Sequence, residues 1–225
     1  MTLQTILKDL KARRNPDAIA GMARFGIHTS NTYGVSAGEL RELAKTVGRD
    51  HALANELWVT GLRDARILAA FIDDPAEVDA AQMRHWVADF DSWDVCDGCC
   101  IHLFRKTKDA HAVAGEWTAD EREFVRRAGF AMIATLAVHD KKALDAVFLT
   151  YLEAVRTAAG DDRNFVKKAV NWALRQIGKR NLRLHTHALL TAEDLALAES
   201  RSARWIARDA LRELRSEKTI ARIKP

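Results

Sequence analysis

Apolar residues recur along most of the chain at the three- and four-residue spacing that is typical of helices. In the first segment, Leu3, Ile6, Leu7 and Leu10 fall on one helical face. No stretch shows a convincing alternation of apolar and polar residues, as a half-buried strand would. The pattern therefore predicts an all-α chain. The expected helices cover residues 2–14, 16–25, 37–47, 50–59, 62–73, a segment from Met83 to Val87, 93–105, 119–138, 141–159, 162–180, 191–200 and 202–216.

Capping and helix-breaking residues separate these segments. Asn15-Pro16 ends one helix and starts the next, because proline fits the first turn of a helix. Ser36 is expected to cap the helix that Gly48 closes. Ser92 is followed by Trp93 and an acid in the first turn, so its hydroxyl is expected to cap a helix that begins at Trp93.

One short motif repeats at long range. Phe124-Val-Arg-Arg-Ala128 recurs about 40 residues later as Phe165-Val-Lys-Lys-Ala169, and Trp205-Ile-Ala-Arg208 follows at a similar distance. Leu62-Arg-Asp-Ala65 is a fainter copy. Helices of any all-α protein look alike, but a period near 40 built from two helices favours HEAT-like repeats. We therefore expect one HEAT-like domain over residues 1–217, stacked into a curved solenoid, and a loose basic tail over 218–225.

The basic residues follow the same repeat. The chain carries 35 Lys and Arg against 31 Asp and Glu, a net charge of +4. Arg127, Lys168 and Arg208 recur at the same point of the repeat unit. Each alone also fits a solvated surface charge, but a periodic row predicts a basic concave face that suits a duplex phosphate backbone.

The three cysteines, Cys96, Cys99 and Cys100, form one cluster and are a poor disulfide framework. With His102 they have part of a zinc spacing, but a structural zinc site usually takes its four ligands from two separated pairs. We expect packing and no metal. There is no apolar run of the roughly 18 residues that a membrane span needs and no signal-peptide core. The expected location is the cytoplasm, with nucleoid association in a prokaryotic cell.

Trp93 and Asp97 lie four residues apart and therefore share one face of the predicted helix. An aromatic plane beside a carboxylate can hold a positively charged group, by cation–π attraction and by direct charge. The alternative is a buried tryptophan beside a capping or surface aspartate.

Together these features resemble the AlkD-type DNA alkylation repair glycosylases, which have a HEAT-like helical fold. The resemblance covers roughly residues 18–216. The motifs that carry it are Tyr33-Gly-Val35 with Leu40-Arg41, Leu57-Trp58, Ala65-Arg66, Ser92-Trp-Asp-Val-Cys-Asp97, Arg126-Arg-Ala128 and Phe165-Val-Lys-Lys-Ala-Val-Asn-Trp-Ala-Leu-Arg175.

The resemblance implies a monomer that excises positively charged N3- and N7-alkylpurines from duplex DNA without metal or cofactor. It implies that Asp97 is the catalytic carboxylate, that Trp93 and Trp172 flank the lesion, and that Arg127 holds a phosphate, with Arg126 as the alternative. Phe25 is a departure, because relatives have a tyrosine near this point that approaches the DNA. The expected DNA-binding residues are Arg66, Arg126, Lys167, Lys168, Arg175, Lys179, Arg208 and Phe25.

Two other functions fit the sequence. A non-catalytic HEAT-like protein that recognises damaged or branched DNA would keep the basic face without needing Trp93, Asp97 and Trp172. A helical-repeat scaffold for protein interactions would show no salt-dependent binding to DNA.

Overall fold

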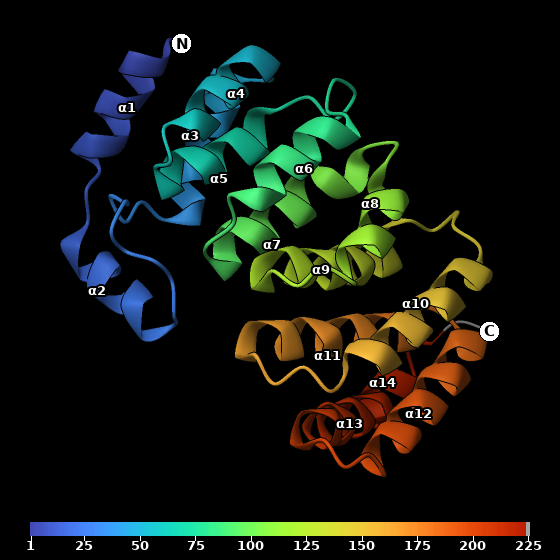
Figure 1. Cartoon of the computed structure of the whole chain (residues 1–225). Coiled ribbons are helices and arrows are strands. Elements are labelled where there is room, and N and C mark those ends of the chain that lie inside the picture. The colour runs from blue at the N-terminus through green and yellow to red at the C-terminus, as the bar shows by residue number, and fades with distance from the viewer. Residues whose placement is uncertain (224–225) are drawn as a thin grey trace. The chain divides into compact units, whose positions relative to one another are not determined.

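The computed structural model describes residues 1–223, which fold into fourteen α-helices and one short 3₁₀ helix without a strand (Figure 1). The all-α prediction is confirmed. The chain divides into two compact units, unit 1 from Met1 to Asp109 and unit 2 from Ala110 onward. The single HEAT-like domain over 1–217 stays a prediction. Among the described residues, no helix has both the length and the apolar content needed to cross a membrane.

Unit 1 contains seven α-helices, and several begin and end at the capping residues that the sequence indicates. Ser36 forms a capping box with Glu39, and Gly48 closes the following helix with φ 79°. Trp58 and Trp86 stack in the core with ring centroids 4.0 Å apart. The helices are α1 Leu3–Ala12, α2 Pro16–Arg24, α3 Ala37–Val47, α4 His51–Val59, α5 Arg63–Ile72, α6 Ala80–Ala88 and α7 Trp93–His102, followed by the 3₁₀ helix η1 Phe104–Lys106.

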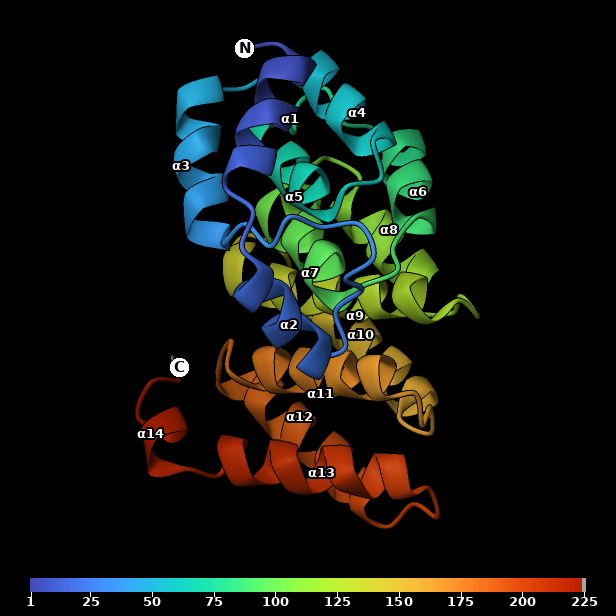
Figure 2. The same cartoon turned by 90° about the vertical axis from the view of Figure 1, so that its left-hand side faces the viewer.

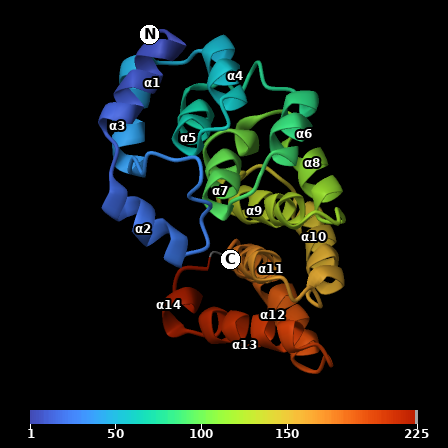
Figure 3. The ribbon, with the colours of Figure 1, turned by 60° about the vertical axis from the view of Figure 1, so that its left-hand side comes forward.

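In unit 1, α5 packs against both α3 and α7 (Figure 3). Its apolar face is almost continuous, because Ala65, Ile67, Leu68 and Ala69 are all buried. Helix α7, which carries Trp93 and Asp97, therefore packs directly on α5.

Unit 2 contains the remaining seven α-helices, and α11 packs against α9, α10, α12 and α13 (Figure 2). Two glycines allow close approach. A Cβ on Gly129 would lie 2.7 Å from the backbone nitrogen of Thr118, and one on Gly178 would lie 2.8 Å from a methyl group of Leu214. The helices are α8 Ala110–Trp117, α9 Glu123–His139, α10 Asp145–Ala158, α11 Asn164–Gly178, α12 Leu182–Ala196, α13 Arg201–Leu214 and α14 Glu217–Ile220.

Several predicted boundaries are wrong. The sequence did not predict α8, and the helix expected over 191–200 begins much earlier, at Leu182, where the Asn181 side chain caps it. The helix expected to run to about Arg105 ends at His102. The tail expected to be loose from 218 onward starts inside α14, and its last two residues, 224 and 225, lie outside the described residues.

The repeat holds for two of its copies. Phe124 and Phe165 occupy the second position of α9 and of α11, and their ring centroids lie 5.4 Å apart. Trp205 is the fifth residue of α13, so the third copy does not begin a helix as predicted. The motif therefore marks the start of a helix in α9 and α11 but not in α13.

Candidate active site

Trp93 and Asp97 lie on one face of α7, each half-buried, as the spacing predicts. The indole Nε1 of Trp93 donates to the backbone carbonyl of Phe25 at 3.0 Å. Phe25 ends α2 and leaves 71% of its own surface exposed. The structure therefore brings Phe25, Trp93 and Asp97 into the same part of unit 1, and the end of α2 helps to set the orientation of the Trp93 ring.

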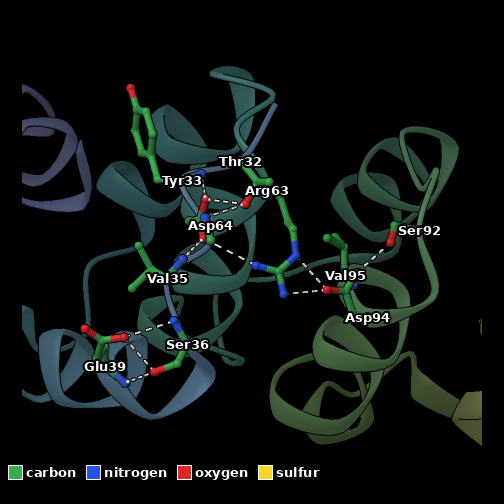
Figure 4. Close-up of polar contacts among 11 residues, drawn as sticks. Thr32, Tyr33, Val35, Ser36, Glu39, Arg63, Asp64, Ser92, Asp94 and Val95 are labelled. Atoms are coloured by element: carbon green, nitrogen blue, oxygen red, sulfur yellow. Dashed lines mark hydrogen bonds and ion pairs between the residues drawn. The ribbon is translucent and has the colours of Figure 1, made fainter. Parts of the chain in front are cut away.

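A polar network fixes the first turn of α7 (Figure 4). Asp94 accepts from the Ser92 hydroxyl at 2.6 Å and from the Val95 backbone nitrogen at 2.9 Å. Arg63 of α5 donates to the other oxygen of Asp94, with Nε at 2.6 Å and Nη2 at 2.5 Å. The predicted capping role of the Ser92 hydroxyl is wrong, because this hydroxyl binds Asp94 and no backbone amide of the helix.

The same network continues through Asp64, whose side chain is completely buried. Its carboxylate accepts from the Thr32 hydroxyl at 2.8 Å and from the backbone nitrogens of Tyr33 and Val35 at 2.7 and 2.9 Å. Arg63 Nη1 lies 3.3 Å from the same carboxylate. Arg63 thus links the loop before α3 to the start of α7.

The sequence did not single out Asp64. The available signal was a carboxylate inside the apolar motif Leu62-Arg-Asp-Ala65 at the start of a helix. Its partners are backbone amides of a loop about thirty residues earlier, and no local pattern reveals such a pairing.

The cysteine cluster is buried in α7. Within residues 1–223, none of Cys96, Cys99 and Cys100 forms a disulfide, and none has exposed surface. Burial raises the pKa of the Cys99 thiol well above its ordinary value, so the thiol stays protonated. Residues 1–223 hold no group of three or more His, Cys, Asp or Glu arranged to bind a metal ion. The three cysteines are therefore part of the buried core of unit 1, and their role in packing stays a prediction.

In unit 2, Trp172 is half-buried on α11. Its indole Nε1 lies 3.3 Å from the amide oxygen of Gln176, in the amide orientation that satisfies both groups. Lys168, Arg175 and Lys179 lie four residues before, three after and seven after Trp172, and therefore on the same side of the helix.

These three cations are not equally available. Lys168 is exposed. Arg175 forms an ion pair with Glu213 of α13, and Lys179 Nζ lies 2.6 Å from the same carboxylate. A DNA phosphate at Arg175 or Lys179 would therefore have to compete with Glu213.

Arg127 and Arg126 hold α9 to its neighbours in unit 2. Arg127 is only 6% exposed, and its Nη1 donates to the backbone carbonyl of Phe165 at 2.8 Å. Arg126 Nη1 donates to Asp161 at 2.9 Å. Contact of either arginine with a phosphate stays a prediction.

The other predicted DNA-binding residues differ in exposure. Arg66 is mostly buried, and its Cζ lies 4.9 Å from the centre of the Trp58 ring. Its Nη1 donates to the backbone carbonyl of Asp89 at 3.1 Å. Lys167 Nζ lies 5.2 Å from the centre of the Trp205 ring, and Arg208 is exposed.

The predicted row of equivalent cations is therefore uneven. Lys168 and Arg208 reach solvent, whereas Arg127 at the same repeat position is buried. Arg127 and Lys168 are each the fifth residue of their helix, whereas Arg208 is the eighth residue of α13. The repeat therefore does not place the three basic residues at one point of a helix, and Arg127 is covered where it contacts the start of α11.

Comparison with known proteins agrees with the fold and the motifs. The family model for DNA alkylation repair enzyme matches residues 6–214. A solved structure superimposes with a TM-score of 0.80 and 22% sequence identity, covering 95% of each chain. It is described as a new family of proteins related to the HEAT-like repeat DNA glycosylases with affinity for branched DNA structures. No curated protein matches the chain. The predictions of a HEAT-like fold and of the family are confirmed.

Proposed function

The chain belongs to the DNA alkylation repair enzyme family, and from this premise we propose that it is a glycosylase that releases N3- and N7-alkylpurines from duplex DNA. One observation carries the proposal. Trp93 and Asp97 share a half-exposed face of α7. The first turn of that helix is tied to α5 by the Arg63–Asp94 ion pair. A carboxylate used for catalysis needs this kind of fixed support.

The proposed chemistry is hydrolysis of the N-glycosidic bond. A purine alkylated at N3 or N7 is cationic, so it takes the bonding electron pair and departs neutral without a strong general acid. The sugar becomes an oxocarbenium-like cation, as in glycoside hydrolysis. In this proposal Asp97 stabilises that cation and orients the water that adds to C1′ and loses a proton.

Trp93 and Trp172 supply aromatic faces in the two units. Each is half-buried, and each indole nitrogen has a hydrogen-bond acceptor nearby. We assign to Trp93 contact with the lesion nucleotide, where a cationic base or sugar is attracted to the π face. The contact of Trp172 with the lesion, which the sequence resemblance implies, stays a prediction.

We assign to Arg127 a phosphate contact alongside its bond to Phe165. A guanidinium carries five N–H donors, and one donor on a carbonyl does not prevent donation to a phosphate. Because Arg127 is largely buried, this contact needs an approach of the DNA close to α9.

The test is single-turnover base release from a duplex with one 7-methylguanine, comparing wild type with Asp97→Asn. We expect the variant to lose at least about 100-fold in rate, as removal of one electrostatic stabiliser typically does, while its Kd for the duplex stays close to wild type. Asp91→Asn is the matched control, since Asp91 is exposed and pairs only loosely with His28 at 3.3 Å. Full activity in Asp97→Asn would remove the carboxylate from the mechanism.

A second candidate is DNA binding without catalysis. The observation that favours it is the similar structure whose protein has affinity for branched DNA. This candidate predicts salt-dependent binding to a four-way junction by the wild type, with no release of 7-methylguanine or 3-methyladenine.

A further inference from the structure

The last long helix of unit 2, α13, carries a stripe of arginines along one side. At 3.6 residues per turn, its five members fall within an arc of about 80°, and all are exposed. The opposite side of α13 is buried through Ala203, Ala207, Ala210 and Leu214. The members of this arginine stripe are Arg201, Arg204, Arg208, Arg212 and Arg215.

The two ends of the stripe differ in charge compensation. Arg212 pairs with Asp209, and Arg215 pairs with Glu193. Among residues 1–223, Arg201, Arg204 and Arg208 form no ion pair with a carboxylate. The uncompensated charge therefore gathers on the first two turns of α13.

Two further features favour the binding of an anion at this part of α13. Arg201 is the first residue of α13, where the helix dipole also attracts anions. An open hollow of about 650 Å³ lies along this part of the helix. It is lined by Ala196, Arg201, Arg204, Arg208 and Leu211.

We infer that the first two turns of the arginine stripe bind the phosphate backbone of DNA, as a contact surface additional to the candidate active site. Arginine binds phosphate through paired N–H donors. From Arg201 to Arg208 the helix rises about 10 Å, which matches about three nucleotides at 3.4 Å each. The hollow is open along α13, which suits an extended backbone rather than a small ligand.

A membrane surface is a poor partner for this helix. Binding in the membrane interface uses an amphipathic helix whose apolar face is free to insert, and the apolar face of α13 is already buried inside unit 2. An acidic protein remains the alternative partner, and the experiment below separates it from DNA.

The stripe does not use the side of α13 that faces α11, the helix that carries Trp172. That side is formed by Asp209, which accepts from Asn171 at 2.6 Å, and by Glu213, which contacts Lys179 at 2.6 Å. DNA on the stripe therefore leaves the side chains around Trp172 in place. Of the stripe, only Arg208 was predicted from the sequence to bind DNA.

The experiment measures binding of fluorescent unmodified duplex DNA by the full chain over a range of salt concentrations. Arg201→Gln/Arg208→Gln removes two charges without breaking an ion pair. Lys11→Gln/Arg14→Gln removes two exposed charges of unit 1 and is the matched control. We expect the stripe variant to bind about tenfold more weakly or worse near 0.1 M salt. We also expect its plot of log K against log[salt] to be shallower by about 1.8, since each phosphate contact contributes about 0.9.

Unmodified DNA keeps this test independent of base release, so failure of the glycosylase proposal does not affect it. An unchanged affinity and slope, which an acidic protein partner would also give, overturns the inference. Equal losses in the control variant overturn it as well, because they would reflect net charge alone. Arg201→Lys/Arg208→Lys changes the same two positions but keeps both charges, and it should retain most of the wild-type salt slope. This result would show that the loss in Arg201→Gln/Arg208→Gln comes from the missing charges and not from misfolding.

Discussion

Replacement of Asp64 by Asn gives the sharpest test of the network that supports α7. The buried carboxylate accepts from the Thr32 hydroxyl and from the amides of Tyr33 and Val35, at 2.7 to 2.9 Å. Asparagine has nearly the same shape but offers one acceptor oxygen and presents an NH₂ group to the remaining donors. At least one donor of the loop is then left without an acceptor.

The expected loss follows from these contacts. A hydrogen bond to a charged group contributes about 1.5–3 kcal/mol, and a buried donor left without a partner costs about 1–3 kcal/mol. The neutral amide costs less to bury than a carboxylate, which offsets part of the loss. We therefore expect Asp64→Asn to lower the free energy of unfolding by about 3 kcal/mol.

The assay combines urea unfolding with amide hydrogen exchange at Tyr33 and Val35. Exchange at these two amides reports directly on the loop and does not require the two units to unfold together. Asp91→Asn, on the exposed surface, is expected to change stability by less than about 0.5 kcal/mol. The reasoning is refuted if Asp64→Asn is equally mild and exchange at Tyr33 and Val35 is unchanged.

Two further predictions concern unit 2. Arg163, and after it Arg126, lowers the pKa of Asp161 to about 2 from an ordinary 3.8. The folded-state pKa is the lower one, so the stabilisation is present above pH 4 and is lost as the pH falls toward 2. Asp161→Asn should cost about 2 kcal/mol at pH 7 and much less near pH 2.5; urea unfolding at both values checks this, and a pH-independent difference contradicts it. Arg127→Lys keeps the charge but loses the planar fork. This substitution should lower the free energy of unfolding by about 1–2 kcal/mol, because the hydrogen bond to the Phe165 carbonyl is weakened, and it should weaken DNA binding several-fold. Wild-type stability in urea unfolding would exclude the structural role, and wild-type DNA affinity by fluorescence anisotropy would exclude the phosphate contact.

Local signals in the sequence predicted the parts of the fold that depend on neighbouring residues. The start of α2 at Asn15-Pro16, the Ser36 capping box and the shared face of Trp93 and Asp97 each follow from a few adjacent positions. The early part of α12 was missed because polar His185, Thr186 and His187 interrupt its apolar period.

The burial of individual site residues was not predictable in the same way. Arg127 and Lys168 occupy equivalent positions of the repeat, but only Arg127 is buried, at a point where it donates to the carbonyl of Phe165 at the start of α11. The role of Asp64 depends on the path of a distant loop. The burial of Arg127 and the contacts of Asp64 follow from tertiary packing, which the periodic pattern of apolar residues does not predict.

The central claim is that this chain hydrolyses the N-glycosidic bond of alkylated purines. The most direct measurement is single-turnover release of 7-methylguanine and 3-methyladenine from duplex DNA by the wild-type protein, with EDTA present and with Asp97→Asn beside it. The account predicts release of at least one base by the wild type and a loss of about 100-fold or more in the variant. Tight binding of the same duplexes without release of either base would contradict the account and favour a DNA-binding protein without glycosylase activity.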